Sequence, residues 1–192
     1  MNTNKKIYSL VIIGVFAAII SIISAIPLGF EIFGVRASLQ TFAMALAGFT
    51  LGHKKGTLTV FIYILIGAIG LPVYSCFTSG FGVLFGVSGG FIFGFLLLSF
   101  MSGISMKLSI PKDKPNLKLP FGILRILISI LGLTLCHILG ILWAAYYLNM
   151  TLPATALLIS VPYIAKDIIS LILAYLVALS IKKAMIRVSI NI

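Results

Sequence analysis

Long apolar runs separated by short polar turns make up most of this 192-residue chain. A helix of about 20 apolar residues can cross the hydrocarbon core of a bilayer, and the first run, residues 7–26, has that length. A signal peptide is the alternative for this run, but its length favours a retained helix. The pattern predicts an all-α membrane protein with one domain, residues 1–192, and six transmembrane helices at about 7–26, 37–51, 57–73, 90–106, 121–147 and 154–181.

The last helix has two possible starts, because Pro153 and Pro162 both offer helix-start or kink positions. A start near Ile164 places Lys166 and Asp167 in the first turn, close to the membrane surface. A start at Ala154 places them about 18–20 Å along the helix, at 1.5 Å per residue. Pro162 favours the first arrangement, which also lowers the cost of burying two charges.

Composition supports a membrane protein, since 61% of the residues are apolar and 9% are charged. The net charge of +11 does not indicate a nucleic-acid partner, because the basic residues lie between the apolar runs rather than on one face. With six helices these basic segments fall on one side of the membrane, and the positive-inside rule makes both termini cytoplasmic. The segments contain Lys5, Lys6, Lys54, Lys55, Lys107, Lys112, Lys114, Lys118, Lys182, Lys183 and Arg187.

Sequence motifs for ATP hydrolysis and for metal-dependent catalysis are missing. Neither GxxxxGK[ST] nor HExxH occurs. Cys76 and Cys136 stand in apolar surroundings without the spacing of metal ligands. The sequence therefore predicts a protein that is not an enzyme and that holds neither a cofactor nor a metal.

An uncharged, glycine-rich segment, PVYSCFTSGFGVLFGVSGG at residues 72–90, connects the third and fourth helices. Irregular loops of more than about 12–15 residues are usually functional or disordered. At membrane depth, irregular backbone is found where protein buries it or where it lines a cavity. We expect a lid over a ligand, with a re-entrant structural plug as the alternative. Ser88, Gly89 and Gly90 would present N–H groups at a helix start, which suits a ligand carboxylate.

Four polar residues in apolar surroundings are candidate ligand contacts. Lys166 and Asp167 are adjacent on a helix and point about 100° apart, so we expect them to address a shared ligand rather than to pair. Arg36 and Gln40 are four residues apart, on one helix face. The alternative is helix capping for Asp167 and snorkelling for Lys166. For Arg36 it is an arginine at the membrane interface, and for Gln40 an amide that contacts another helix.

The helix at 121–147 carries polar and aromatic side chains with more than one possible use. We expect Thr134 and His137 to make hydrogen bonds between helices rather than to catalyse a reaction. Trp143, Tyr146 and Tyr147 suit an aromatic belt at the outer membrane surface, and some of them could line a ligand pocket instead.

Residues 35–95 resemble the BioY family, the biotin-specific substrate-binding (S) components of energy-coupling-factor (ECF) vitamin transporters. The matching pieces are SLQTF, LAGFTLG, YILIGAIGLPVY and GVSGGFIFGF, with a weaker match at the proline before Lys166 and Asp167. The resemblance implies a six-helix S-component fold in the bacterial cytoplasmic membrane, with a high-affinity biotin pocket on the outer side. It also implies a transmembrane coupling (T) subunit and two cytoplasmic ATPase subunits as partners.

The resemblance also implies roles for particular residues. Asp167 would accept a hydrogen bond from a ureido N–H of biotin, and Lys166 would donate to the ureido carbonyl or to the carboxylate. The family usually has lysine three positions after the aspartate, where this chain has Ser170. The expected biotin-binding set is Asp167, Lys166, Arg36, Gln40, Tyr74, Phe85, Ser88, Gly89, Gly90 and Tyr147.

Small residues on the first helix are the expected contact with the coupling subunit, as in related proteins. The stretch GVFAAIIS offers Gly14 with Ala18, and Ala17 with Ser21, for close helix packing. Two other functions stay open: an S component for another vitamin, and a small proton-coupled carrier that uses Lys166 and Asp167 as its relay.

Overall fold

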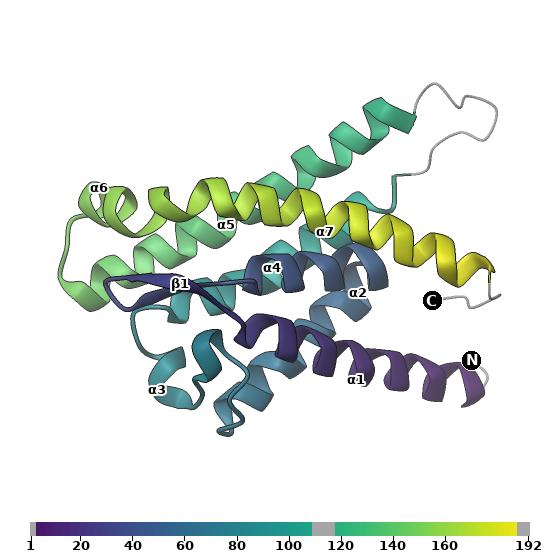
Figure 1. The fold of residues 1–192 in the computed structure, drawn as a ribbon, viewed down its shortest axis with the longest axis horizontal. Helices are drawn as coiled ribbons and strands as arrows, with labels where there is room; N and C mark the ends of the chain where they lie inside the picture. Colours follow the sequence, from purple (N-terminus) through teal and green to yellow (C-terminus); the bar gives the residue numbers. More distant parts are fainter. Residues whose placement is uncertain (1–2, 109–117, 188–192) are drawn as a thin grey trace.

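The computed structural model describes residues 3–108 and 118–187, which form an elongated bundle of helices with both chain ends at the same end of the bundle (Figure 1). A two-stranded antiparallel hairpin and two very short helices lie at the opposite end. The elements are α1 (Thr3–Ala25), β1 (Pro27–Ile32), β2 (Val35–Ser38), α2 (Gln40–Ala68), α3 (Phe81–Leu84), α4 (Gly89–Ser105), α5 (Lys118–Leu148), α6 (Leu152–Thr155) and α7 (Val161–Arg187).

Three stretches of helix are long and apolar enough to cross a membrane, namely Lys6–Ala25, Pro120–Leu148 and Leu152–Met185. Helix α4 is also apolar and is 17 residues long. The long helices expose large apolar side chains such as Leu10, Leu127 and Leu173. Apolar side chains on the outside of a helical bundle are stable against lipid rather than water, so the chain is an integral membrane protein.

Helix α2 folds back on itself at Gly52, whose φ of +78° and ψ of 173° are open essentially to glycine alone. Its two arms lie side by side, because Gln40 Nε2 donates to the Tyr63 hydroxyl at 2.9 Å. The helices expected at 37–51 and 57–73 are therefore the arms of one helical hairpin, 40–51 and 53–68.

Glycines bring the arms of α2, helix α4 and helix α5 into close contact. A Cβ at Gly48 would collide with the Ser99 carbonyl oxygen, and one at Gly94 would lie 2.8 Å from Cys136 Sγ. Large side chains fill the remaining core, including the fully buried Phe49 and Leu98. Small residues at helix contacts are the usual means of close packing inside a membrane, where lipid removes the hydrophobic driving force.

The last helix begins earlier than Pro162 indicated. Helix α6 starts at Leu152 and runs through a π-helical turn, Ala156–Ser160, directly into α7. Proline lacks an N–H and its ring crowds the preceding turn, and the wider π turn gives Pro162 room within a continuous helix. Asp167 thus lies about 22 Å from the helix start, at 1.5 Å per residue, rather than in the first turn.

The β1–β2 hairpin is an addition to the expected all-α fold. Glu31 pairs with Arg36 and Ile32 with Val35 across the two strands. The two turn residues between them, Phe33 and Gly34, both have positive φ angles of 47° and 80°. Two-residue turns with positive φ match the twist of an antiparallel hairpin, so this segment closes tightly before α2 begins.

Candidate functional site

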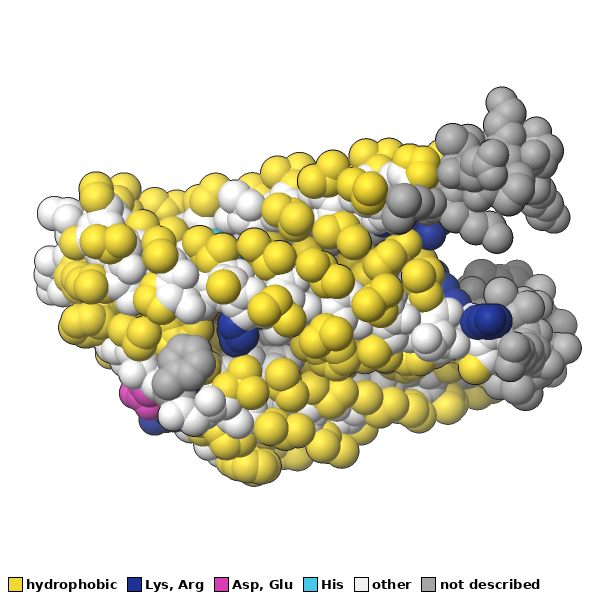
Figure 2. All heavy atoms as spheres, turned by 45° about the horizontal axis from the view of Figure 1, so that its top comes forward, with side chains coloured by type: hydrophobic (Ala, Val, Ile, Leu, Met, Phe, Trp, Pro, Cys, Tyr) yellow, Lys and Arg dark blue, Asp and Glu magenta, His cyan; other side chains and the backbone are white. Residues whose placement is uncertain are grey.

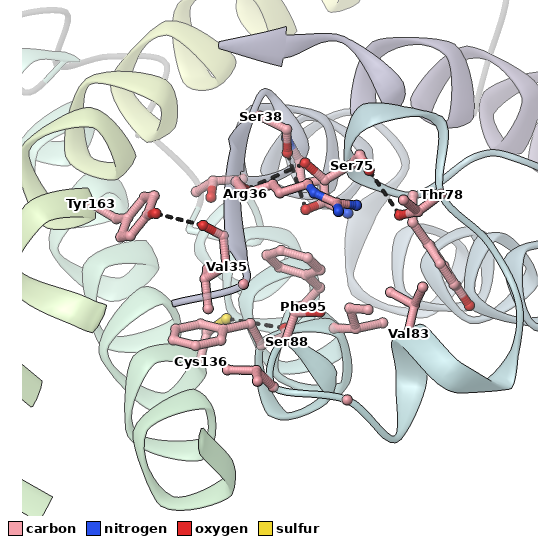
Figure 3. Close-up of a pocket in the computed structure, with 18 of the residues that line it drawn as sticks. Val35, Arg36, Ser38, Ser75, Thr78, Val83, Ser88, Phe95, Cys136 and Tyr163 are labelled. Atoms are coloured by element: carbon pink, nitrogen blue, oxygen red, sulfur yellow. Dashed lines mark hydrogen bonds between the residues drawn. The ribbon is translucent and has the colours of Figure 1, made fainter. Parts of the chain in front are cut away.

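A pocket with a cavity volume of about 240 Å³ lies where the hairpin, the 72–90 segment and helices α2, α4, α5 and α7 meet (Figure 3). Its walls are mixed, as is usual for small-molecule sites, in which an apolar lining carries a few convergent polar groups. The apolar lining includes Val35, Val83, Val87, Phe91, Ile92, Phe95 and Leu133. The polar lining includes Arg36, Ser38, Gln40, Thr41, Ser75, Thr78, Ser88, His137, Lys166 and Asp167.

Asp167 is the most heavily bonded side chain of this pocket. Its Oδ1 accepts a hydrogen bond from Thr41 Oγ1 at 2.5 Å and pairs with Lys166 Nζ, also at 2.5 Å. Its Oδ2 lies 3.2 Å from His137 Nε2. The carboxyl-bearing residue is only 5% exposed. An uncompensated charge at that depth is costly, and these three donors offset the cost.

The expectation that Lys166 and Asp167 would not pair is wrong. Their Cα–Cβ bonds diverge on the helix, but the four-carbon stem of lysine is flexible enough to fold back across that angle. Lys166 Nζ also donates to the Ser38 carbonyl oxygen at 3.2 Å, and it lies 6.0 Å from the centre of the Tyr163 ring. The lysine therefore joins α7 to strand β2.

Tyr163 makes a second connection between α7 and the hairpin. Its hydroxyl donates to the Val35 carbonyl oxygen at 2.7 Å, the contact drawn in Figure 3. Together with Lys166, it fixes β2 against the last helix through main-chain oxygens of Val35 and Ser38. The hairpin thereby forms one wall of the pocket.

His137 connects three elements of the site. Its Nδ1 lies 2.6 Å from the Ser160 hydroxyl in the π-helical turn, while its Nε2 faces Asp167. A neutral imidazole that donates from Nε2 to the carboxylate accepts the Ser160 hydroxyl at Nδ1. The expected interhelical hydrogen bond of His137 is confirmed. Thr134 behaves differently, since its exposed hydroxyl donates to Ile130 of its own helix at 3.0 Å.

Arg36 and Gln40 both line the pocket, but not from one helix face. Arg36 belongs to strand β2, and its Nε donates to Glu31 Oε2 at 2.8 Å. This hydrogen bond raises the pKa of Arg36 above its ordinary value. Both partners are half-exposed, and such ion pairs contribute about 0–1 kcal/mol. Gln40, at the start of α2, is held by Ser38 and Tyr63.

The 72–90 segment covers one side of the pocket with short helical turns rather than an open loop. Tyr74 lines the pocket, and its buried hydroxyl donates to the Ile64 carbonyl oxygen at 2.6 Å. Ser75 and Thr78 lie beside the Arg36 guanidinium in Figure 3. Trp143 Nε1 donates to the Gly86 carbonyl oxygen at 2.9 Å, which ties the segment to α5.

Four residues of the expected biotin-binding set stand outside the described pocket walls. Phe85 and Tyr147 are 59% and 52% exposed, and Phe85 stacks on Phe81 instead. Gly89 and Gly90 are buried packing positions, since a Cβ at Gly90 would lie 2.5 Å from the Leu139 carbonyl oxygen. The N–H of Gly89 already donates to the Gly86 carbonyl oxygen at 3.1 Å.

Several pocket residues were not expected from the sequence, above all Thr41 and His137 as partners of Asp167. The available signal was weak: each is a polar side chain within an apolar helix, and such side chains within a membrane usually face the protein interior. Ser38, Ser75, Thr78, Cys136 and Tyr163 also line the pocket. Among the described residues, no cluster of three or more His, Cys, Asp or Glu side chains could hold a metal ion.

The small residues of α1 divide between two faces. Ala17 and Ser21 are 2% and 7% exposed and pack against the protein. Gly14 and Ala18 face outward, and none of the described atoms lies within 4 Å of a Cβ built at Gly14. Only Gly14 and Ala18 of the expected contact set are therefore open to another subunit.

Comparisons with known proteins agree with one another along nearly the whole chain. Residues 1–187 match the model of the BioY family. The chain is 36% identical to the biotin transporter BioY of Thermotoga maritima over 172 residues, a match that spans 88% of this chain and 93% of the relative. It is 34% identical to the biotin transporter BioY2 of Lactococcus lactis subsp. cremoris, over 95% of this chain and 94% of the relative. A crystal structure of the S-component for biotin from an ECF-type ABC transporter superposes with a TM-score of 0.78, at 26% identity and 95% coverage of each chain.

Proposed function

The chain belongs to the BioY family, and we propose that it takes up biotin as the S component of an ECF transporter, holding the vitamin in the pocket around Asp167. The observation that carries this proposal is the buried Asp167 carboxylate, which three donors orient into a pocket large enough for a small organic molecule. The fold is that of a biotin S component, and the chain is a transporter component rather than an enzyme.

The ureido ring of biotin is the part that suits the Asp167 end of the pocket. It presents two N–H donors and a carbonyl acceptor, and a carboxylate accepts several hydrogen bonds at once. Asp167 accepts a ureido N–H through the lone pair of Oδ2 that remains open, since Thr41 and Lys166 occupy Oδ1 and His137 takes one site on Oδ2. Lys166 Nζ, which also contacts the Ser38 carbonyl oxygen, is the donor nearest to a ureido carbonyl placed there.

The thiophane ring and the aliphatic tail suit the apolar wall made by α4 and α5. Phe91 and Phe95 of α4 and Leu133 of α5 line that wall, and Val83 of α3 adds to it. Burying apolar surface stabilises a complex by about 25 cal/mol per Å². This wall contributes affinity without selecting among vitamins, so the polar end of the pocket carries the specificity.

The valerate carboxylate is assigned to the Arg36 side of the pocket. Arg36 carries a guanidinium, which binds carboxylates with two parallel hydrogen bonds, and Ser75 and Thr78 lie beside it in Figure 3. The backbone of Gly89 and Gly90 is less suitable than expected, because both glycines are buried against Trp143 and Leu84. Glu31 would release Arg36 when the ligand carboxylate arrives.

ATP hydrolysis would come from partner subunits, namely a coupling (T) subunit in the membrane and two ATPase subunits in the cytoplasm. The outward face of α1 at Gly14 and Ala18 supports such a contact, since it lets another helix approach closely. Both termini and the basic helix ends would face the cytoplasm, where the ATPases are.

Calorimetry on the purified protein tests the substrate assignment. Biotin should bind tightly and saturably without nucleotide, desthiobiotin more weakly because it lacks the thiophane ring, and thiamine not at all.

Exchanging biotin for its uncharged carboxamide tests the Arg36 assignment. The wild type should prefer biotin, while an Arg36→Gln variant should bind both compounds about equally. A folded protein that does not bind biotin would contradict the substrate assignment. An Arg36→Gln variant that still prefers biotin over the carboxamide as strongly as the wild type would contradict the Arg36 assignment.

A further inference from the structure

A second charged site lies at the other end of the molecule, around Arg125. This residue is in the second turn of α5 and is only 9% exposed. One of its five N–H groups has a described partner, since Nη2 donates to the Leu108 carbonyl oxygen at 2.6 Å, just beyond the end of α4. Its Nε is buried and meets no hydrogen-bond acceptor among the described residues. Arginine stays charged in proteins, so the described residues leave the buried Nε–H of this guanidinium without an acceptor.

The acidic residues described in the structure lie elsewhere. Glu31 pairs with Arg36 and Asp167 with Lys166, while the third acid of the chain, Asp113, lies outside the described residues. Among the described residues, Lys182 of α7 is a partly buried cation whose charge is repelled by that of Arg125, and α7 packs against α5. Two partly buried cations that repel each other favour a shared anion between them.

The surroundings favour an anion that belongs to a lipid. Arg125 lies about 10 Å from the start of α5, at 1.5 Å per residue, and so close to one end of a helix that is long enough to cross a membrane. Figure 2 shows Lys and Arg side chains in a hollow at the end of the molecule that carries both termini, next to a largely apolar surface. On the same two helices, Leu124, Leu127 and Leu179 expose apolar side chains on which acyl chains can lie.

We propose that Arg125 and Lys182 bind the phosphate group of an anionic membrane lipid between the first turns of α5 and the end of α7. Basic pockets between transmembrane helices on the cytoplasmic side commonly bind such headgroups. The lipid would bridge α5 and α7 at the end of the bundle opposite the pocket. This site is independent of biotin binding, which uses the other ends of the same two helices.

Native mass spectrometry of the full-length protein, titrated with phosphatidylglycerol against a phosphatidylcholine background, tests the proposal. Arg125→Gln and Lys182→Gln should each lower the affinity for phosphatidylglycerol about five-fold, as expected for one basic residue at a lipid headgroup. Lys183→Gln is the matched control, because Lys183 is the next residue of α7, carries the same charge and is exposed. It should keep the wild-type affinity.

Lys182→Gln keeps the test decisive if the buried Arg125 variant does not fold. An equal loss of phosphatidylglycerol affinity in Lys183→Gln would show that the lipid is attracted to the basic surface in general, and would overturn the proposed site. Unchanged affinity of Lys182→Gln for phosphatidylglycerol would also overturn the proposed site. Inorganic phosphate that displaces phosphatidylglycerol at equal concentration would overturn the lipid part of the proposal. Biotin calorimetry on the same variants should give wild-type affinity, which separates this inference from the proposed function.

Discussion

Two regions of the bundle, the Asp167 network and the contact between α2 and α4, use polar side chains differently. At the pocket end, Asp167 uses both carboxylate oxygens and His137 both ring nitrogens in contacts with other side chains. At the contact between α2 and α4, the buried Thr50, Ser99 and Ser102 hydroxyls have no hydrogen-bond partner within the described chain.

The difference reflects what each region needs. Gly48 meets the backbone at Ser99, so α2 and α4 approach there as closely as their backbones allow. Serine and threonine serve at such contacts because they are small, whether or not their hydroxyls are bonded. The pocket end needs polar groups held in fixed directions, since a ligand gains affinity when its contacts are already ordered. The contact between α2 and α4 thus depends on close approach, and the Asp167 network on paired polar groups.

The largest effect is expected when the central charge of the pocket is removed. Asp167→Asn keeps the shape of the side chain but leaves Lys166 as an unpaired cation, and breaking a buried pair in this way costs about 3–5 kcal/mol. Biotin affinity should fall at least ~100-fold (about 2.8 kcal/mol at 1.4 kcal/mol per decade), as measured by calorimetry. An affinity within a few-fold of wild type would mean that Asp167 does not bind the ligand.

The close-packed contact between α2 and α4 should respond in stability rather than in binding. Gly48→Ala places a methyl group against the Ser99 backbone, and such overpacking costs about 1–3 kcal/mol. The variant should unfold at lower temperature in detergent while its folded fraction binds biotin normally. Gly14→Ala is the matched control, since its new methyl group meets open space, and alanine favours a helix by about 1 kcal/mol. Equal destabilisation by both changes would refute the packing account.

A smaller effect is expected at His137, which orients Asp167 without being required to touch the ligand. His137→Gln removes the ring that joins Asp167 to Ser160, and loss of one hydrogen bond to a charged group costs about 1.5–3 kcal/mol. Biotin affinity should fall about ten-fold or more, as measured by calorimetry on the folded protein. His53→Gln, which alters a half-buried histidine in the α2 turn outside the pocket, should have no effect on binding. Equal affinities in the two variants would contradict the positioning role.

The smallest effect is expected from the Thr41 hydroxyl. Thr41→Val removes one of two groups on Asp167 Oδ1 and leaves Lys166 in place, so a cost of about 0.5–1.5 kcal/mol is expected. That corresponds to roughly two- to twelve-fold weaker biotin binding. Thr134→Val is the control, because Thr134 is exposed and bonds only within its own helix. A loss of the same size in both variants would point to a general effect of β-branched apolar residues.

The sequence predicts the helices better than their connections, and for a physical reason. Apolar runs long enough for a membrane mark α1, α5 and α7 directly. The β1–β2 hairpin gives little signal, because its turn places Phe33 at a positive φ, a conformation that a bulky residue rarely adopts. The start of the last helix was misjudged because proline normally ends or begins a helix, whereas the π turn at 156–160 accommodates Pro162 within it.

Half of the site depends on contacts that only the folded chain provides. Asp167, Lys166, Arg36 and Gln40 could be singled out because polar residues in apolar segments need an explanation. That Asp167 meets Thr41, 126 positions earlier, follows from how the helices pack. Conversely, the sequence pattern at Gly89 and Gly90 suggested an anion site. In the structure, these residues lack a side chain because they pack against Trp143.

A crystal structure of the biotin complex is the most direct test of the central claim, that the Asp167 network recognises the ureido ring. A ureido nitrogen should lie within about 3.2 Å of an Asp167 carboxylate oxygen, with the valerate carboxylate at Arg36. A ligand bound in the reverse direction, or a ureido ring held by other residues while Asp167 keeps only its three present partners, would contradict that claim.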